Sequence, residues 1–371
     1  MNVDILTHEK SISKARARMA IADCDIHPSP KSVEIEIFPF LSKRWQEYMK
    51  TYGVIYRQGF PTGPAFPKGQ PNAARRDSYP TSGGKPGSDL AFMQSQHLGP
   101  NNIQLGVLNP LQCAQGVQNQ DFSAAYCNAV NQWQIEQWTS KDHRLKASLM
   151  VPYEDPLASV KEIEKWAGNE HFIQVLLLSR TAEPLGQRKY WPIYDAACRA
   201  GLPVAVHAFG YGGAPVTGGG WPSFYIEEMV GHAQNTQSLL TSMVIEGVFE
   251  KFPTLKLILV EAGFAWLPAL SWRLDKVWDR MRDEIPHVSR PPSQLIREHV
   301  WLTTQPMEEP EESNQLLDTI EWIGWENLLF ATDYPHWDYD DPSRAMPIKI
   351  GKQQKEGFFL NNALKLYGLD Q

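Results

Sequence analysis

Residues 202–207 read Leu-Pro-Val-Ala-Val-His, a short apolar run that ends in a histidine just before a glycine-rich loop. The segment in front of it, residues 190–200, carries its apolar side chains at helical spacing. The same alternation of short apolar run and helical segment extends in both directions from this unit. Near-continuous apolar strands separated by helices are typical of parallel βαβ units, in which both faces of the sheet are covered.

The chain contains eight such apolar runs, which we predict to be strands: Ala20–His27, Ile103–Leu108, Leu145–Val151, Phe172–Leu178, Leu202–His207, Leu255–Glu261, His299–Thr304 and Asn327–Asp333. The longer segments between them predict helices: Phe122–Trp138, Ala158–Ala167, Tyr190–Ala200, Ser238–Phe252, Trp266–Arg282 and Asn314–Trp322. Eight strands are the number that closes a (β/α)8 TIM barrel. We therefore predict this α/β barrel over residues 20–371, after an N-terminal extension of residues 1–19. A doubly wound sheet is the alternative, although no G-x-G-x-x-G follows the first predicted strand.

A Gly/Pro-rich insertion follows the first predicted strand. Residues 59–87 hold six Gly and six Pro among 29 residues, too many for a regular helix or strand. We place the inserted arm at about residues 30–100. It is either a mobile surface segment or an ordered arm, and in the second case its aromatic residues would hold it over the pocket or a neighbouring subunit. These aromatic residues are Tyr56, Phe60, Phe66 and Tyr79. We favour packing on a second subunit and expect a homo-oligomer, a dimer or larger; a hetero-oligomer with a related subunit is the alternative.

Charge and composition limit the partners. The chain has 35 basic and 42 acidic residues, for a net charge of −7, so we expect no nucleic-acid partner. No apolar run reaches the length of a membrane span, so we expect no membrane partner. The polar first twenty residues show no signal-peptide core, and the four cysteines form no C-x-x-C pair. We expect a cytoplasmic protein that acts on a small molecule.

The strongest chemical signal is the segment Ala22–Pro28, which reads Ala-Asp-Cys-Asp-Ile-His-Pro. Residues two apart on a strand point to the same face, so Asp23, Asp25 and His27 should all face the barrel interior. Polar side chains in that position are costly unless something binds them. A carboxylate and an imidazole at the end of a barrel strand fit a pair of metal ligands. The alternative is that Asp25 caps the following loop and His27 is a hydrogen-bonded pocket residue.

Two further strands end in the same type of residue. His207 ends the fifth predicted strand, and Asp333 ends the eighth, in the segment Phe-Ala-Thr-Asp-Tyr-Pro-His of residues 330–336. A closed barrel brings the carboxyl ends of its strands together around one mouth. We therefore expect Asp25, His27, His207 and Asp333 to meet there.

The D-x-H of the first strand, the V-H of the fifth and the F-A-T-D-Y-P-H of the eighth resemble the amidohydrolase superfamily. The closer resemblance is to the branch with aminocarboxymuconate-semialdehyde decarboxylase and the γ-resorcylate-type decarboxylases, to which Gly247–Pro253 and Trp266–Trp272 are also similar. It spans roughly Ala20 to Gly368, apart from the arm. The resemblance implies that Asp25, His27, His207 and Asp333 bind one divalent ion, usually Zn²⁺, with Fe or Mn as alternatives. It also implies that Asp333 takes a proton from metal-bound water.

One position departs from the decarboxylases. In those enzymes the sixth strand ends in a histidine followed by Gly-Gly, whereas here Glu261 stands in that place, followed by Ala-Gly. Glu261 is a candidate general base, a partner of the ligands, or a ligand of a second metal; the alternative is a structural acid paired with an arginine. His232, which we expect near the start of the helix after the fifth strand, is its candidate neighbour, or else a surface residue. Some members of the wider family are thought to use paired iron or manganese for oxygen chemistry, which a set including Glu261 and His232 would allow.

Two features bear on the substrate. Arg180 follows the fourth predicted strand and is a candidate for clamping a substrate carboxylate, or else a solvent-facing loop residue. The loop Phe209–Trp221 has six glycines, and its aromatic residues, including Trp221, are candidates for the wall of an apolar pocket.

These patterns favour a metal-dependent enzyme that hydrolyses a small compound, carboxylated or aromatic, through metal-activated water. In that mechanism Asp333 moves the proton, and Glu261 and His232 assist it. The alternatives are non-oxidative decarboxylation, a dinuclear iron or manganese oxygenase, and a catalytically silent partner subunit.

Overall fold

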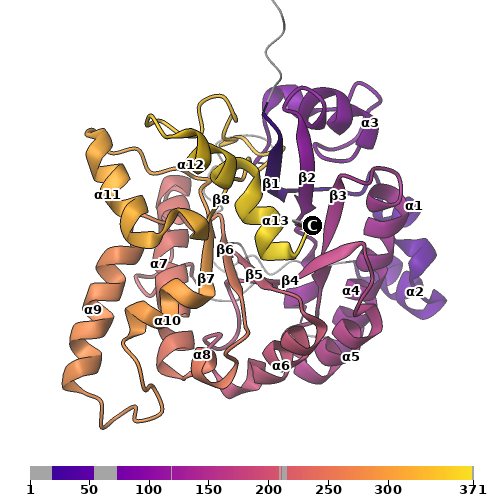
Figure 1. Cartoon of the computed structure of the whole chain (residues 1–371). Coiled ribbons are helices and arrows are strands. Elements are labelled where there is room, and N and C mark those ends of the chain that lie inside the picture. Colours follow the sequence, from indigo (N-terminus) through magenta and orange to yellow (C-terminus); the bar gives the residue numbers. More distant parts are fainter. Residues whose placement is uncertain (1–18, 54–72, 118, 209, 211–214, 370–371) are drawn as a thin grey trace, which may run out of the picture.

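The computed structural model describes residues 19–53, 73–117, 119–208, 210 and 215–369. The N-terminal extension before residue 19, and Tyr56, Phe60 and Phe66 of the arm, lie outside these described residues. The strands within the described chain form one parallel sheet in the order β1 to β8, surrounded by helices (Figure 1). Their bounds are β1 Ile21–Ile26, β2 Ile103–Leu108, β3 Leu145–Met150, β4 Phe172–Leu178, β5 Val204–His207, β6 Leu257–Val260, β7 Val300–Thr303 and β8 Leu328–Leu329.

Backbone contacts join the two ends of this sheet into a barrel. The N–H of Cys24 in β1 donates to the carbonyl of Phe330, just after β8, at 3.0 Å. Beyond it, the N–H of Asp333 donates to the carbonyl of Asp25 at 3.1 Å, and that of His27 donates to Tyr334 at 2.7 Å. The predicted (β/α)8 barrel is therefore confirmed, and the doubly wound alternative, an open sheet, is wrong.

Helices lie between successive strands and cover the outside of the barrel (Figure 1). Their bounds are α1 Val33–Glu36, α2 Lys43–Tyr52, α3 Leu90–Met93, α4 Gln120–Gln134, α5 Pro156–Trp166, α6 Trp191–Ala200, α7 Tyr225–Ile245, α8 Val248–Lys251, α9 Leu267–Arg280, α10 Pro292–His299, α11 Ser313–Ile323, α12 Lys352–Glu356 and α13 Asn362–Tyr367. Every residue of β4 is buried, as expected for a parallel strand that is covered on both faces.

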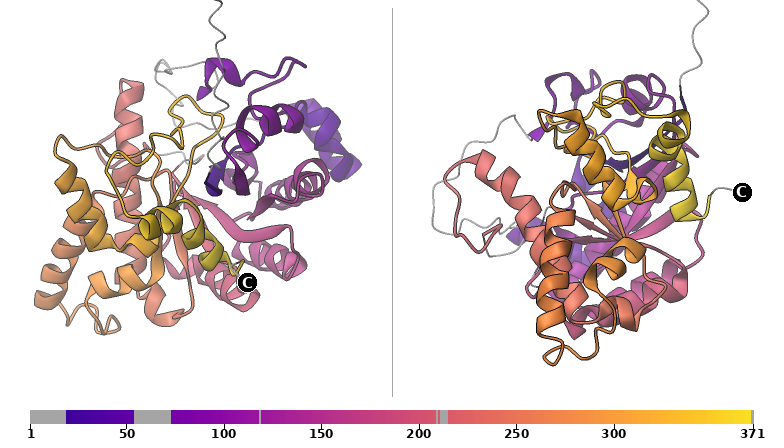
Figure 2. Two further views of the ribbon diagram at one scale, coloured as in Figure 1. Left: turned by 45° about the horizontal axis from the view of Figure 1, so that its top comes forward. Right: turned by 60° about the vertical axis from the view of Figure 1, so that its left-hand side comes forward.

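The helix predicted at residues 238–252 is wrong at both ends. Helix α7 begins thirteen residues earlier, at Tyr225, and projects beyond the ring of helices in both views of Figure 2. Gly247 adopts a left-handed conformation with φ of 80° between α7 and α8, which ends the first helix and starts the second. The glycine-rich loop in front of Tyr225 gave no periodic signal, so the spacing of apolar residues did not predict the first three turns of α7.

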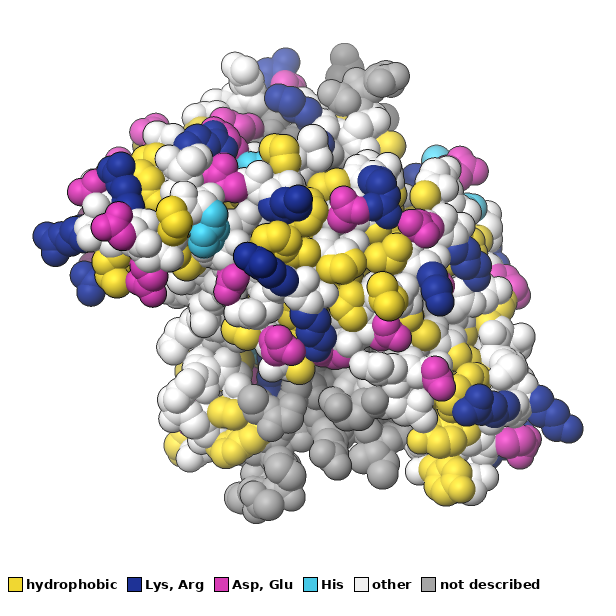
Figure 3. Space-filling model, turned by 90° about the horizontal axis from the view of Figure 1, so that it is seen from below, with side chains coloured by type: hydrophobic (Ala, Val, Ile, Leu, Met, Phe, Trp, Pro, Cys, Tyr) yellow, Lys and Arg dark blue, Asp and Glu magenta, His cyan; other side chains and the backbone are white. Residues whose placement is uncertain are grey.

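Within the described insertion, α1 lies on the outside of the barrel, where Glu36 accepts a hydrogen bond from Trp133 of α4, and the segment after the undescribed stretch lies close to the barrel mouth. Helices α1 and α2 precede the undescribed stretch, and Ala74 then forms an antiparallel bridge with His336, just after β8. A short π-helical turn at Gln94–Leu98 leads into β2. Among the described residues no helix is both long and apolar enough to cross a membrane. Basic and acidic side chains are interspersed on the face shown in Figure 3.

Candidate metal centre

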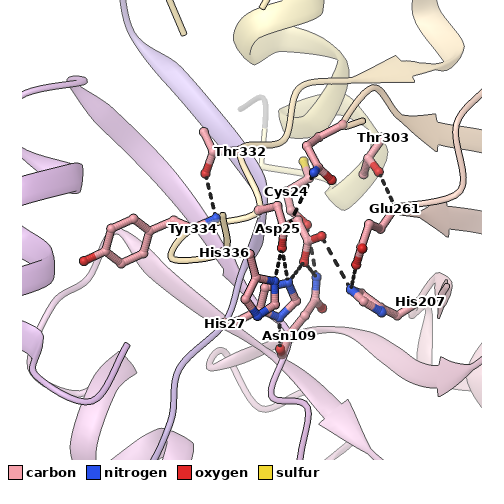
Figure 4. A network of polar contacts seen from close by, with 12 residues as sticks. Cys24, Asp25, His27, Asn109, His207, Glu261, Thr303, Thr332, Tyr334 and His336 are labelled. Atoms are coloured by element: carbon pink, nitrogen blue, oxygen red, sulfur yellow. Dashed lines mark hydrogen bonds and ion pairs between the residues drawn. The ribbon is translucent and has the colours of Figure 1, made fainter. Parts of the chain in front are cut away.

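Asp25 and His27 lie at the carboxyl end of β1, and both are buried (Figure 4). Nδ1 of His27 donates to the backbone carbonyl of Asn109 at 2.7 Å, which directs Nε2 toward the barrel mouth. There Nε2 lies 3.2 Å from Oδ1 of Asp25 and 2.8 Å from Oδ1 of Asp333. A carbonyl on Nδ1 selects the tautomer in which Nε2 is free to bind a cation.

His207, at the end of β5, faces two carboxylates (Figure 4). Its Nε2 lies 2.9 Å from Oε2 of Glu261 and 3.6 Å from Oδ2 of Asp25. Glu261 follows β6, which pairs with β5, so the two side chains enter the mouth side by side. The backbone N–H of Glu261 donates to Oγ1 of Thr303 at 3.0 Å.

Two acidic residues at the mouth have strained backbones: Glu261, directly after β6, and Asp333, which lies four residues beyond the end of β8 rather than at the strand end predicted for it. Glu261 and Asp333 adopt φ of 55° and 62°, a region that non-glycine residues rarely occupy. Such strain persists where the surroundings hold it, commonly at functional sites. Oδ1 of Asp333 lies 2.6 Å from Nδ1 of His336, whose ring stacks on His27 at 4.4 Å between centroids.

The electrostatics of the mouth call for positive charge. Burial alone would raise the pKa of Asp25, but the charges of His27 and His207 hold it well below its ordinary value. Burial alone would lower the pKa of His207, but Glu261 and Asp25 raise it to about 9. Burial and the charge of Glu261 raise the pKa of Asp333. Protons on His207 and on Asp333 are thus favoured in the metal-free protein and reduce the excess negative charge of the mouth.

The donor atoms fit a divalent ion. Oδ2 of Asp25 and Nε2 of His27 are buried without a hydrogen-bond partner among the described residues. One donor atom each from Asp25, His27, His207 and Glu261 lie within 4.8 Å of one another, and so do donor atoms of His27, Asp333 and His336. These are imidazole and carboxylate ligands without sulfur, which suit Zn²⁺, Mn²⁺ and Fe²⁺. The four residues predicted as ligands therefore lie at one mouth, and Glu261 lies there beside them.

The structure adds two residues that sequence reasoning missed. Asp338 groups with Glu261 and Asp333, again within 4.8 Å, and burial together with these two carboxylates raises its pKa to about 8. His336 groups with His27 and Asp333. His336 was visible in the motif of residues 330–336, but neither residue ends a strand, so the strand-end argument passed over both.

Asp23 does not face the metal ligands, contrary to the sequence expectation. Its carboxylate accepts hydrogen bonds from the N–H and Oγ1 of Thr332, at 2.9 and 2.6 Å, and contacts Nε2 of His97 at 2.8 Å. The pairing of β1 with β2 shifts register between Asp23 and Ile26, so strict alternation does not hold there. Asp23 instead joins β1 to the segment after β8 and to the π-helical turn.

The remaining candidates lie around the mouth at different depths. His232 is buried at the end of the second turn of α7 rather than at a helix start; burial lowers its pKa, and the charges of Glu261, His207 and Arg180 act on it. It belongs to none of the ligand groups among the described residues, in which Asp338, rather than His232, lies with Glu261. The buried Arg180 lies 3.9 Å from Glu228 of α7. Trp221 is 44% exposed and lines a separate hollow of about 450 Å³ with Val216, Ile226 and Val230.

A family model for amidohydrolases matches residues 22–369, nearly the whole described chain. The chain belongs to the amidohydrolase family. The geometry and this membership identify a metal-dependent enzyme of the amidohydrolase superfamily. The curated relatives include gamma-resorcylate decarboxylase of Polaromonas sp., 27% identical over 263 residues, which covers 65% of this chain and 76% of that protein. They also include gamma-resorcylate decarboxylase of Rhizobium sp., 24% identical over 262 residues, which covers 63% of this chain and 73% of that protein.

Solved structures share the fold of this amidohydrolase. An amidohydrolase from Mycobacterium avium subsp. paratuberculosis superposes with a TM-score of 0.70 at 20% identity, over 95% of this chain and 99% of that one. 5-Carboxyvanillate decarboxylase from Novosphingobium aromaticivorans, in complex with manganese, gives a TM-score of 0.69 at 18% identity, over 95% and 96% of the two chains.

Proposed function

We propose that this amidohydrolase removes the carboxyl group of a small aromatic acid without oxidation, using one bound divalent cation. The observation that carries the proposal is a buried set of converging donor atoms: those of Asp25, His27, His207 and Glu261 form one group, and His27 also groups with Asp333, 2.8 Å away. The relatives matched over about two thirds of the chain are decarboxylases, which favours this reaction over the hydrolysis ranked first from the sequence. Because related structures hold manganese, Mn²⁺ is the first metal to test, in place of Zn²⁺.

The residues at the mouth divide the chemistry among them. A divalent cation there supplies Lewis acidity, which neutralises charge on the substrate oxygens. Asp333 is the proposed proton donor, because its carboxyl group lies at the mouth with Oδ1 2.6 Å from Nδ1 of His336 and 2.8 Å from Nε2 of His27. The bond between the ring carbon and the carboxylate breaks, its electron pair stays on the ring carbon, that carbon takes the proton, and CO₂ leaves.

Arg180 is the proposed partner of a second anionic group on the substrate. It follows β4 and is charge-coupled to His232, which is in turn coupled to Glu261 and His207. Its side chain is only 9% exposed, so its charge acts in a poorly solvated environment. A guanidinium in that position binds a carboxylate with two parallel hydrogen bonds.

The test is a product assay with the purified protein loaded with Mn²⁺, Zn²⁺ or Fe²⁺. Hydroxylated benzoic acids should release CO₂, and the corresponding phenols should take up labelled bicarbonate in the reverse direction. Asp333→Asn should abolish both reactions. Turnover of esters, amides or lactones, with no CO₂ from any acid, would instead establish the hydrolytic function and refute the proposal.

A two-metal oxygenase is the second candidate, and one observation favours it. Glu261 belongs both to the group of Asp25, His27 and His207 and to the group of Asp333 and Asp338. A carboxylate shared between two ligand groups is suited to bridging two ions. Two equivalents of iron or manganese per chain, with consumption of O₂, would support this candidate; one equivalent would exclude it.

We also propose that the protein is a homo-oligomer. Helix α7 and the loop before it carry exposed apolar side chains, with Phe224, Ile226 and Val230 each more than 60% exposed. Figure 2 shows that this helix projects from the barrel, where a second copy would cover it.

A further inference from the structure

Asn109, directly after β2, contacts four consecutive residues of the end of β1. Its backbone N–H donates to the carbonyl of Ile26 at 2.8 Å, and its backbone carbonyl accepts from Nδ1 of His27 at 2.7 Å. Its side-chain Nδ2 donates to Oδ1 of Asp25 at 2.8 Å and to the carbonyl of Cys24 at 3.2 Å. One fully buried residue therefore holds both metal-ligand candidates of β1.

The amide of Asn109 is itself held from behind. Its Oδ1 accepts from Oγ of Ser148 in β3 at 2.6 Å and from Nε2 of Gln174 in β4 at 3.1 Å. Gln174 also donates to Oγ of Ser148 at 2.8 Å, and its Oε1 accepts from the hydroxyl of Tyr367, the last residue of α13, at 2.8 Å. Asn109, Ser148, Gln174 and Tyr367 form what we name the Asn109 relay.

The donors and acceptors of the relay allow one orientation of each amide. The hydroxyl of Tyr367 occupies Oε1 of Gln174, so the NH₂ group of Gln174 faces Ser148 and Asn109. Both N–H bonds of that group and the Ser148 hydroxyl proton are then used, which leaves Oδ1 of Asn109 as the acceptor. A flipped Asn109 would set Oδ1 against the carboxylate of Asp25 and the carbonyl of Cys24, and two acceptors repel each other when buried.

We propose that Asn109 is the positioning residue of the metal centre, and that Gln174 and Tyr367 set its orientation from the opposite end of the barrel lumen. The relay holds Oδ1 of Asp25 with a hydrogen bond and leaves Oδ2, which has no hydrogen-bond partner among the described residues, for the cation. The backbone carbonyl of Asn109, which Asn109→Ala retains, fixes the tautomer of His27. This inference rests on the metal site of the proposed function, and it adds that a residue of the C-terminal helix controls metal affinity without touching the ligands.

The test measures the affinity of the full chain for Mn²⁺. The protein is stripped with a chelator and titrated with Mn²⁺ in competition with a fluorescent indicator, and chemical denaturation of the metal-free form is followed in parallel. Asn109→Ala should weaken binding about 10- to 100-fold, the usual effect of removing a partner of a metal ligand. Tyr367→Phe removes only the hydroxyl, and it should weaken binding about 3- to 5-fold.

Two buried residues outside the barrel lumen serve as matched controls. Asn131 of α4 donates from Nδ2 to the carbonyl of Met150 at 2.9 Å, and the hydroxyl of Tyr194 of α6 donates to the carbonyl of Leu185 at 2.6 Å. Asn131→Ala and Tyr194→Phe should lower the stability of the metal-free protein while leaving its Mn²⁺ affinity within twofold of the wild type.

The double variant Asn109→Ala/Tyr367→Phe decides whether the relay is the route. The hydroxyl of Tyr367 also contacts the side chain of Cys24, beside Asp25. If Tyr367 nevertheless acts through Asn109, the second change should add nothing to the loss caused by the first. A loss of Mn²⁺ affinity in the double variant equal to the product of the two single losses would overturn the relay. So would a wild-type affinity in Asn109→Ala, or an equal loss of affinity in the two control variants. If Asn109→Ala does not fold, the test compares the Mn²⁺ affinities of Tyr367→Phe and Tyr194→Phe, of which only the first should be weakened. A wild-type protein that binds no Mn²⁺, Zn²⁺ or Fe²⁺ refutes the proposed function itself, whereas binding that Asn109→Ala leaves unchanged refutes only this inference.

Discussion

Glu261→Gln should flatten the dependence of the stability of the metal-free protein on pH between 6 and 10. Oε2 of Glu261 lies 2.9 Å from Nε2 of His207, and its charge is the foremost cause that raises the pKa of His207, against burial, to about 9. Glutamine keeps the size of the side chain and removes its charge. The substitution therefore isolates the electrostatic part of the contact.

The size and sign follow from proton linkage. A folded-state pKa of about 9 lies about 2.5 above the ordinary value of 6.5, which corresponds to about 3 kcal/mol at 1.36 kcal/mol per unit. Because the folded pKa is raised, this stabilisation is fully present below pH 6.5 and is lost as the pH rises through 9. Asp338, whose pKa is raised to about 8, adds a loss of the same sign between pH 6 and 8, in part through Glu261.

Urea denaturation in the presence of chelator, at pH 6, 8 and 10, measures the effect. The wild type should lose more than Glu261→Gln across this range, with about 3 kcal/mol as the upper limit, because Asp25 also raises the pKa of His207. Glu250→Gln is the control, since Glu250 is an exposed acid that accepts a hydrogen bond from Ser289 far from the mouth. Parallel curves for the wild type and Glu261→Gln would refute the claim that Glu261 and His207 form a coupled pair.

Three further predictions concern the metal, a structural ion pair and the assembly. His207→Ala should leave a folded barrel but remove bound metal and activity together, because Nε2 is one of the converging donors; stoichiometric metal in the purified variant would contradict the assignment. Asp142, whose pKa is lowered to about 2 by hydrogen bonds from Arg144, contributes stability above pH 4 that is lost as the pH falls toward 2. Asp142→Asn should therefore cost about 1–2 kcal/mol at pH 7 by chemical denaturation and almost nothing at pH 2. Ile226→Asp/Val230→Asp should shift the protein to a smaller species in sedimentation velocity, since both apolar side chains are exposed on α7; a monomeric wild type would disprove the oligomer.

The barrel and its first ligands were predictable because they depend on local patterns. Each strand of a parallel barrel is buried on both faces, so it appears as an apolar run in the sequence, and the run Phe172–Leu178 has the same bounds as β4. The ligand argument needed only the rule that carboxyl ends of barrel strands meet at one mouth. That rule brought together Asp25, His207 and Asp333, which are far apart in the chain.

The rest of the centre depends on contacts that no local pattern encodes. Asp23 is two residues before Asp25 in the sequence, yet the register shifts between Asp23 and Ile26, and His97 from a π-helical turn and Thr332 from beyond β8 bind Asp23 instead. Asp338 reaches the carboxylates from a loop without periodicity. His232 was predicted near the start of a helix, whereas it lies inside α7, which begins at Tyr225.

The sequence by itself determined where the strands lie, because burial on two faces restricts strand composition at every position, although β8 ends at Leu329, four residues before the predicted Asp333. Only the tertiary structure decided which of the polar residues share a cation and which satisfy one another. The orientation of Asn109 is the clearest case, since it depends on donors from β3, β4 and α13 that meet only inside the closed barrel. A buried polar group must find its partner across the fold, and the chain order does not reveal that partner.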